Sequence, residues 1–242
     1  MKRNKSILYT TMLAVLLSLV GVSCSTTARL GEGEVLYTGV KKLNYKENNT
    51  KIDGDVQDQI FEAIDVAPNN SLYSPYYRTP FPIGLWVYNH WNPNAKGLKG
   101  WLYRKLVSQP VLVSRVRPET RVDMINTLLR NNGYFTSSAS YKLNYSSKNK
   151  KKASITYDVK VNEPYCLGEL KYLNMGTPLT DIIDSVAKKN SYFQTGNRYC
   201  LDSLNAVRIE ITNVLRNKGY YYFKPEYLEY LADSVSAKGT VN

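Results

Sequence analysis

Histidine and cysteine are scarce in this chain of 242 residues, which contains one histidine, His90, and three cysteines. No CxxC spacing occurs, so we expect no zinc or transition-metal site. A Walker loop, GxGxxG, HExxH and GxSxG are also missing from the sequence. Without GxSxG and a neighbouring histidine, a serine has no base to activate it. We therefore expect a protein that is not an enzyme and that has no cofactor.

The N-terminus has the pattern of an export signal. Residues 1–23 begin with cations and continue as the apolar run Ile7–Val22. This run is shorter than the roughly 20 residues of a spanning helix and is typical of a signal peptide. Small residues precede Cys24 as in a lipobox, although Gly21 replaces the usual leucine. We predict lipidation of Cys24 and a lipid-attachment linker over 24–33, with ordinary cleavage or an uncleaved anchor as alternatives.

The formal net charge is +12, a basic balance that in other proteins often serves nucleic-acid binding. We expect no nucleic acid as partner, because an exported chain does not meet the chromosome. Acidic lipid head groups or acidic partner proteins are better candidates. A basic surface that is merely solvated explains the charge equally well.

A heptapeptide occurs twice in the mature chain. The segment Leu129–Phe135, LRNNGYF, returns 86 residues later as Leu215–Tyr221, LRNKGYY. Apolar residues at helical spacing precede both copies, so each copy ends a predicted amphipathic helix. Gly133 and Gly219 fall where a helix ends in a left-handed residue. Pro118 is a favoured first residue for the earlier helix, and Asp202 is a predicted N-cap of the later one.

Strand signals surround these helices, and the 21 tyrosines favour sheet structure. Residues 153–161 alternate strictly between apolar and polar side chains, as in a half-buried strand. Residues 141–145 are the predicted hairpin partner, and 220–230 is the predicted aromatic strand after the later helix. The remaining predicted elements are strands at 35–45 and 165–173 and helices at 56–64 and 179–187.

The chain therefore has the pattern of an α+β protein with tandem β-α-α-β-β units, two helices on a small mixed sheet. With LRNxGY closing the second helix, this unit resembles a POTRA domain of the BamA/TamA type of outer-membrane barrel-assembly protein. Three further stretches resemble the TamA-like lipoprotein branch: Glu34–Val40, Leu85–Asn89 and Leu201–Asn205. The resemblance extends over about residues 32–231.

The resemblance divides the mature chain into a first unit over 34–163, with an insertion at 71–110, and a second unit over 164–231. The second unit is expected to lack its last strand, and 232–242 to be a polar tail. The resemblance implies a barrel at the C-terminus of the parent, so we expect this chain to be truncated before it. A natural short form is the alternative.

The resemblance implies that the chain is a periplasmic module held at the outer membrane. Its expected partners are unfolded outer-membrane proteins or subunits of the assembly machinery, bound by β-augmentation at a sheet edge. The expected edge is the strand after each second helix, and the edge candidates are Tyr134, Phe135, Tyr141, Tyr145, Tyr220 and Tyr222. Alternatively, these tyrosines fill ordinary sheets. A second functional reading is a free-standing periplasmic lipoprotein scaffold without a barrel.

The insertion at 71–110 concentrates aromatic and basic residues. Its membrane-interface candidates are Trp86, Tyr88, Trp91 and Trp101, accompanied by lysine and arginine. The other interpretation is that these aromatics cap the core of their own domain. Cys166 and Cys200 form a candidate disulfide in the periplasm, or remain as free buried thiols.

Overall fold

The structure, a computed structural model, describes residues 26–47, 50–72, 74–169, 171, 178–233 and 239–241. The predicted signal peptide and Cys24 lie outside these residues. Spatial contacts divide the chain into two compact parts, which we describe separately. Part I comprises the described residues up to Gly39, Val66–Val116 and Asn144–Ser154; part II comprises Val40–Asp65, Arg117–Leu143 and the described residues from Ile155 onward.

One mixed sheet contributes residues to both parts. Its strands are β1 (Leu36–Glu47), β4 (Ser138–Tyr145) and β5 (Lys152–Val161), in the order β1-β5-β4. The backbone N–H of Leu36 donates to the carbonyl of Lys151 at 2.8 Å, and two residues later the Thr38 hydroxyl donates to the Ala153 carbonyl at 3.1 Å. Because both partners advance in the same direction, β1 runs parallel to β5. The strands predicted at 35–45, 141–145 and 153–161 are confirmed.

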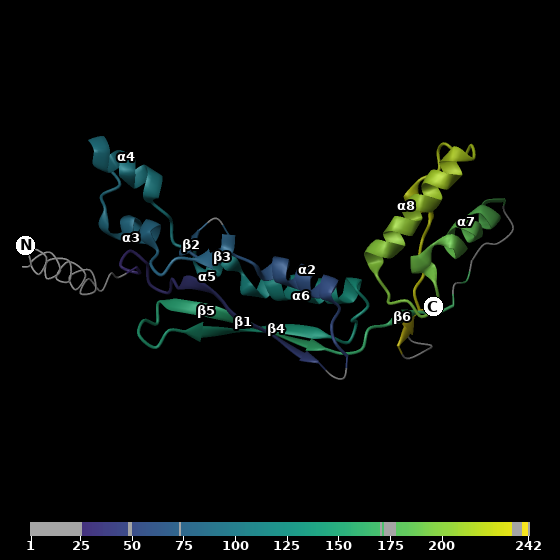
Figure 1. The fold of residues 1–242 in the computed structure, drawn as a ribbon, viewed down its shortest axis with the longest axis horizontal. Helices are drawn as coiled ribbons and strands as arrows, with labels where there is room; N and C mark the ends of the chain where they lie inside the picture. The colour runs from purple at the N-terminus through teal and green to yellow at the C-terminus, as the bar shows by residue number, and fades with distance from the viewer. Residues whose placement is uncertain are drawn as a thin grey trace, which may run out of the picture. The chain divides into compact units, whose positions relative to one another are not determined.

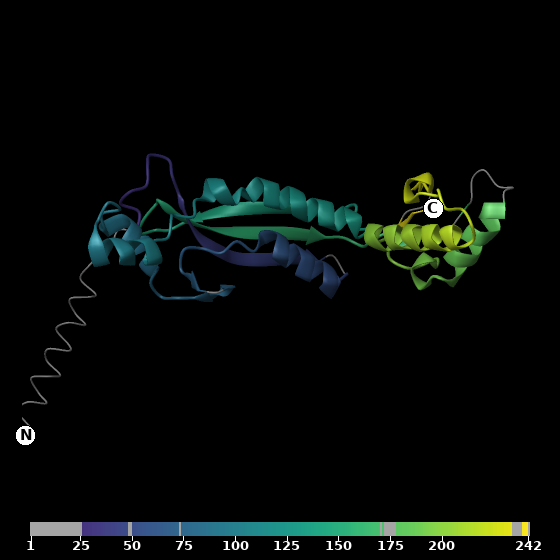
Figure 2. The same cartoon turned by 90° about the horizontal axis from the view of Figure 1, so that it is seen from above.

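In part II, two helices cover one face of this sheet (Figure 1). They are α2 (Gly54–Ile64) and α6 (Pro118–Asn131), which run side by side (Figure 2). Ile60 of α2, Leu129 of α6 and Tyr157 of β5 are fully buried. Every second residue of β5 is buried, as the alternation predicted. Burial of each large apolar side chain contributes about 1.5–3 kcal/mol, so this helix-on-sheet core holds the first repeat together.

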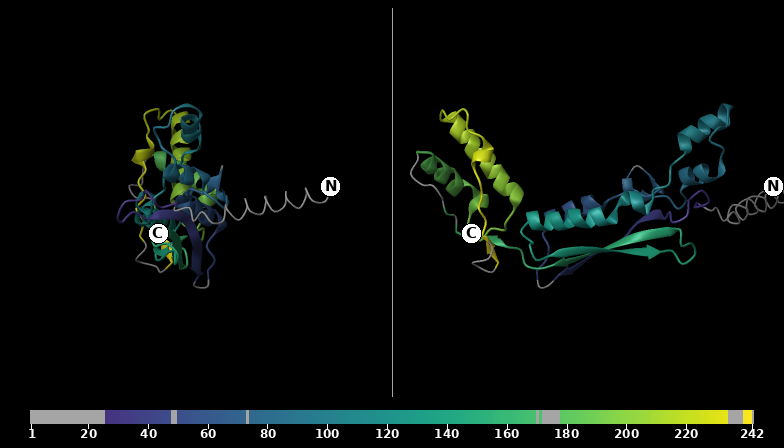
Figure 3. Two further views of the ribbon diagram at one scale, coloured as in Figure 1. Left: turned by 90° about the vertical axis from the view of Figure 1, so that its left-hand side faces the viewer. Right: turned by 180° about the vertical axis from the view of Figure 1, so that it is seen from behind.

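A second helix pair lies in part II, formed by α7 (Pro178–Lys189) and α8 (Leu201–Asn217) (Figure 3). The spacing-based prediction of both helices is confirmed, and they pack through a cluster that includes Val186, Val207 and Ile211. Beside them are the 3₁₀ turns η1 (Ser191–Phe193) and η2 (Pro225–Tyr227) and the short parallel strands β6 (Cys166–Leu167) and β7 (Thr240–Val241). The α+β class with two helix-pair units is therefore confirmed.

The predicted aromatic strand at 220–230 is wrong. These residues form a turn and the 3₁₀ turn η2, and no strand of the described chain pairs with them. A strand exists only where another strand takes up its backbone hydrogen bonds, and Pro225 also lacks a donor. The predicted strand at 165–173 is limited to β6 among the described residues, and the predicted polar tail contributes β7.

The ends of α8 and α3 also differ from expectation. Helix α8 begins after Cys200, so Asp202 lies in its first turn instead of at the N-cap. His90 is the last residue of α3, in the insertion where no helix was predicted. Among the described residues, no helix combines the length and apolar character that crossing a membrane requires.

The predicted insertion is a structured segment of part I. It contains the hairpin β2 (Ser71–Leu72) and β3 (Ser74–Arg78), then α3 (Ile83–His90) and α4 (Gly97–Leu106); the short α5 (Val113–Val116) follows. Leu85 of α3 is fully buried in a cluster with Leu30, Leu36 and Leu112. Helix α3 therefore belongs to the core of part I.

Candidate functional site

Strand β4 is an edge of the three-stranded sheet, with β5 as its only neighbouring strand among the described residues. The two strands are antiparallel: the Ser146 N–H donates to the Lys152 carbonyl at 2.9 Å, and the Ser154 hydroxyl donates to the Asn144 carbonyl at 3.4 Å. In such a pair, every second residue directs its backbone groups to the neighbour. The backbone N–H and C=O groups of the even-numbered residues of β4 therefore point toward β5, and those of the odd-numbered residues point away from it.

At one end of β4, an outward-facing backbone group is already hydrogen-bonded to a side chain. The N–H of Ala139 donates to the side-chain oxygen of Asn126 on α6 at 2.7 Å. Leu143 and Tyr145 lie at the other end of β4, where Tyr145 is 55% exposed. The second half of β4 is thus the accessible stretch of this edge.

Tyr141 lies in the middle of β4 and is half-buried. Its hydroxyl donates to the carboxylate of Glu119, in the first turn of α6. This hydrogen bond lowers the pKa of the Glu119 carboxyl below its ordinary value. Tyr141 therefore links β4 to α6 through this hydrogen bond.

Two of the predicted edge residues precede β4 and do not lie on it. Tyr134 is fully buried, its hydroxyl accepts the N–H of Asp53 at 3.2 Å, and burial raises the pKa of this tyrosine. Phe135 packs with ring centroids 5.2 Å from both Tyr165 and Tyr199. A partner strand has no access to Tyr134, so the assignment of this residue to the edge is corrected.

Tyr220 and Tyr222 follow α8 in the turn that replaces the predicted strand. They are 37% and 91% exposed, respectively. Their side chains are accessible, but their backbone is not part of a sheet edge. The structure therefore brings only Tyr141 and Tyr145 of the six candidates onto one edge strand.

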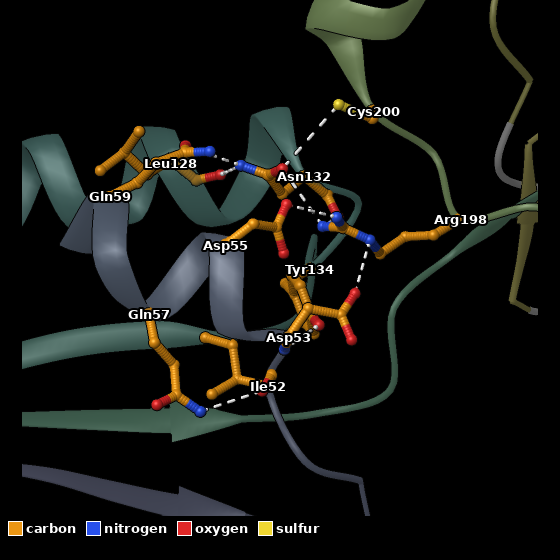
Figure 4. Close-up of polar contacts among 10 residues, drawn as sticks. All are labelled: Ile52, Asp53, Asp55, Gln57, Gln59, Leu128, Asn132, Tyr134, Arg198 and Cys200. Carbon is orange, nitrogen blue, oxygen red and sulfur yellow. Dashed lines mark hydrogen bonds and ion pairs between the residues drawn. The ribbon is translucent and has the colours of Figure 1, made fainter. Parts of the chain in front are cut away.

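A polar cluster that the sequence reasoning missed lies in part II, around Arg198 (Figure 4). The Arg198 Nε lies 2.8 Å from Asp53 Oδ2, and its Nη2 lies 3.0 Å from Asp55 Oδ2. Its Nη1 donates to both oxygens of Asn132, at 3.1 and 3.2 Å. The guanidinium also lies over the Tyr134 ring, 5.9 Å from the centroid. This arginine joins the end of the first helix pair to the start of the second.

The first copy of the heptapeptide provides part of the surface that Arg198 contacts, through Asn132 and Tyr134. Asn132 is buried, and its amide donates to Leu128 and Gln59 while its oxygens accept from Arg198. Gly133 has φ +85°, and the N–H of Tyr165 donates to its carbonyl at 2.8 Å. In the second copy, position 218 is a lysine instead of asparagine. This difference within the repeat was the available signal for the cluster.

The cysteines and the insertion aromatics are placed as follows. Cys166 and Cys200 are half-buried free thiols, and the Cys200 Sγ lies 3.9 Å from Asn132 Oδ1. The three α3-associated aromatics are half-buried, namely Trp86, Tyr88 and Trp91. Trp101 on α4 is 52% exposed. The insertion thus divides into an inward helix and an outward one.

The second helix pair has a small apolar cleft of about 70 Å³. Phe193, Leu204 and Tyr230 are among its lining residues, and the Tyr230 hydroxyl donates to the Leu204 carbonyl at 3.0 Å. Typical small-molecule sites measure roughly 300–1,000 Å³, so this cleft is too small for one. Over the described ranges, no group of histidine, cysteine and acidic side chains is arranged to hold a metal ion.

Comparison with known proteins gives structural likeness only. No family model matches the chain, and no curated protein does. Among solved structures, POTRA domains 3–5 of Haemophilus influenzae BamA match 88% of this chain at 14% identity and a TM-score of 0.41, over 66% of that fragment. This chain thus spans just under two thirds of the BamA fragment. POTRA domains 1–2 of the periplasmic region of Omp85 from Anabaena match 87% of this chain and 94% of their own at 12% identity, with a TM-score of 0.38.

Proposed function

We propose that this chain is a periplasmic POTRA-type module that binds extended protein segments at the outer membrane by adding them to the β4 edge. One observation carries the proposal: two helix pairs each end in a copy of the repeated heptapeptide, and the first pair covers a sheet of order β1-β5-β4 with an accessible edge. Its partners are unfolded outer-membrane proteins or subunits of their assembly machinery. The lipid on Cys24 and the TamA-like branch belong to the same proposal and rest on the sequence resemblance.

Strand addition accounts for binding without sequence specificity. An incoming strand pairs with backbone groups, which every protein segment carries. On β4 the outward backbone groups belong to the odd-numbered residues, among them Leu143 and Tyr145, whereas the N–H of Ala139 is already occupied by Asn126. Each hydrogen bond contributes only about 0.5–1.5 kcal/mol, and ordering the client opposes that gain. Binding at so short an edge is therefore weak and reversible, as a transfer step requires. The module acts by binding alone.

The experiment is site-specific photocross-linking in living cells. A photoreactive phenylalanine replaces Tyr145 on the edge or, as the matched control, Lys160 on the exposed face of the central strand β5. We expect adducts with outer-membrane proteins or assembly subunits from position 145 and several-fold fewer from position 160. Equal adducts from both positions, or none from position 145, contradict the proposal.

A second pair of variants tests the backbone mechanism. Leu143→Pro removes an outward N–H and spares the ladder to β5, so we expect weaker binding of an extended client peptide. Asn126→Ala exposes the Ala139 N–H, so we expect stronger binding of the same peptide. Circular dichroism establishes that both variants are folded. Unchanged affinity in both folded variants would refute strand addition at β4.

A further inference from the structure

Helix α4 presents an apolar face to solvent. Leu98, Trp101 and Leu106 are 73%, 52% and 44% exposed. With 3.6 residues per turn, they share an arc of roughly 140° with Lys105, and we call these four residues the α4 face. The opposite side carries the buried Gly100, where an added Cβ would overlap the carbonyl oxygen of Ala95. At its glycine the helix therefore lies against the chain that precedes it, and its large apolar residues remain outside.

Cations flank the α4 face. Lys99 and Arg104 lie on either side of it, and both are exposed. The sequence contains no aspartate or glutamate between Asp65 and Glu119, so no acidic side chain of this segment offsets them. An apolar centre with a tryptophan and flanking lysine and arginine is the pattern of a helix that lies in a membrane interface.

The exposed apolar surface continues onto the start of α3. Phe81 and Ile83 are 41% and 56% exposed. Gly84 lies against the end of α4, because its carbonyl accepts the N–H of Ser108 at 3.0 Å and an added Cβ would lie 2.7 Å from the Leu106 carbonyl oxygen. The surface thus extends over two elements of part I.

Helix α3 also holds the chain segment that follows Cys24. The side-chain amide of Asn89 donates to the Thr26 carbonyl at 3.1 Å, and its oxygen accepts the Arg29 N–H at 3.0 Å. Two residues of chain span about 7 Å at full extension. A lipid on Cys24 would therefore be attached next to α3, in the part that carries the α4 face.

We propose that the α4 face binds the surface of a membrane that contains anionic lipid. The cations attract the head groups, and Leu98, Trp101 and Leu106 enter the acyl boundary. This contact is separate from strand addition at β4 and does not depend on it. It would orient part I on the membrane to which the predicted lipid on Cys24 anchors the chain.

The test uses the chain from residue 24 onward with Cys24→Ser, which keeps every described residue and removes the anchor. Flotation measures its binding to vesicles of phosphatidylglycerol and phosphatidylethanolamine, with pure phosphatidylcholine as comparison. We expect binding to the anionic vesicles only, and weaker binding when salt rises from about 0.1 M to about 1 M. With Trp86→Phe and Trp91→Phe, Trp101 is the only tryptophan, and its emission should shift to the blue on binding.

Two double variants locate the contact. Leu98→Ser with Trp101→Ala, and Lys99→Glu with Arg104→Glu, are each expected to lower the vesicle affinity by roughly tenfold or more. The matched controls lie on the second repeat: Tyr221→Ala with Tyr222→Ala for exposed aromatics, and Lys218→Glu for charge. We expect the controls to bind like the parent.

Three outcomes would overturn the proposal. The first is that the parent chain does not bind anionic vesicles. The second is that it binds neutral vesicles equally well. The third is that the α4 variants bind like the parent while remaining folded by circular dichroism. Cross-linking of position 101 to a protein, without vesicle binding, would assign the α4 face to a protein partner instead.

Discussion

The two copies of the heptapeptide permit a matched test at their glycines. Gly133 has φ +85° and Gly219 has φ +102°, so an alanine at either position adopts a left-handed conformation. That conformation costs a residue with a Cβ roughly 1–2 kcal/mol, and the stiffer unfolded chain returns about 0.4–1 kcal/mol. Gly219→Ala should therefore lower the free energy of unfolding by about 1 kcal/mol.

Gly133→Ala carries a second cost. Its added Cβ would lie 2.9 Å from the Tyr199 carbonyl oxygen and 3.0 Å from that of Tyr165, whereas at Gly219 no described atom lies within 4 Å. Both oxygens are backbone atoms, and the Tyr165 carbonyl also accepts the Tyr199 N–H at 2.9 Å, so they cannot turn aside like a side chain. Overpacking of this kind costs about 1–3 kcal/mol. Gly133→Ala should lower the free energy of unfolding by about 2–4 kcal/mol.

Urea unfolding followed by far-ultraviolet circular dichroism measures both variants on the same scale. The expected difference is about 1–3 kcal/mol, with Gly133→Ala the less stable. Equal losses would refute the reasoning, because they would mean that the contact between the end of α6 and the start of the second repeat is not close. A larger loss at Gly219 would refute it as well.

Two further predictions concern polar contacts. Arg198→Ala should lower the free energy of unfolding by about 1–3 kcal/mol, because its pairs with the half-exposed Asp53 and Asp55 contribute little and its hydrogen bonds to the buried Asn132 contribute most. If Arg198→Lys is as stable as the parent in urea unfolding, the planar guanidinium is unimportant. The pKa of Glu119 is lowered in the folded state by its hydrogen bond from Tyr141, so this stabilisation is present above the ordinary value of 4.5 and is lost as pH falls below it. Tyr141→Phe should therefore be less stable than the parent near neutral pH, by up to about 1 kcal/mol because the carboxyl is exposed. This difference in stability should shrink below about pH 4. A difference that does not vary with pH in acid titrations of stability would contradict the prediction.

The four helices of part II and the central strand were readable from sequence because their signals are local, whereas α3, α4 and α5 of part I were not predicted. Alternation over 153–161 identified β5 and its buried face, and apolar spacing identified α6, α7 and α8. Both glycines of the repeated heptapeptide end a helix with positive φ, as predicted. Each of these features depends on contacts or conformations within about two helical turns.

The predictions that were wrong depended on distant partners. An aromatic run at 220–230 has the composition of a strand, but no strand of the described chain pairs with it. Tyr134 follows a helix and precedes β4, yet it is buried beneath the Asp53 backbone. The bond between Arg198 and Asp55 joins residues 143 positions apart, and neither has a local pattern that announces it.

The order of residues alone decided that this chain forms two helix pairs, each ending in a glycine turn. It also decided that the first repeat has a strand of alternating apolar and polar residues. Both follow from sequence because apolar periodicity and the left-handed conformation of glycine act over a few residues. The fold decided which of its tyrosines are exposed, where β4 is accessible and that Arg198 links the two repeats. It also decided that α3 enters the core while α4 faces outward, although both are rich in aromatics. Burial and strand pairing depend on segments far apart in sequence, and only the folded chain brings those segments together.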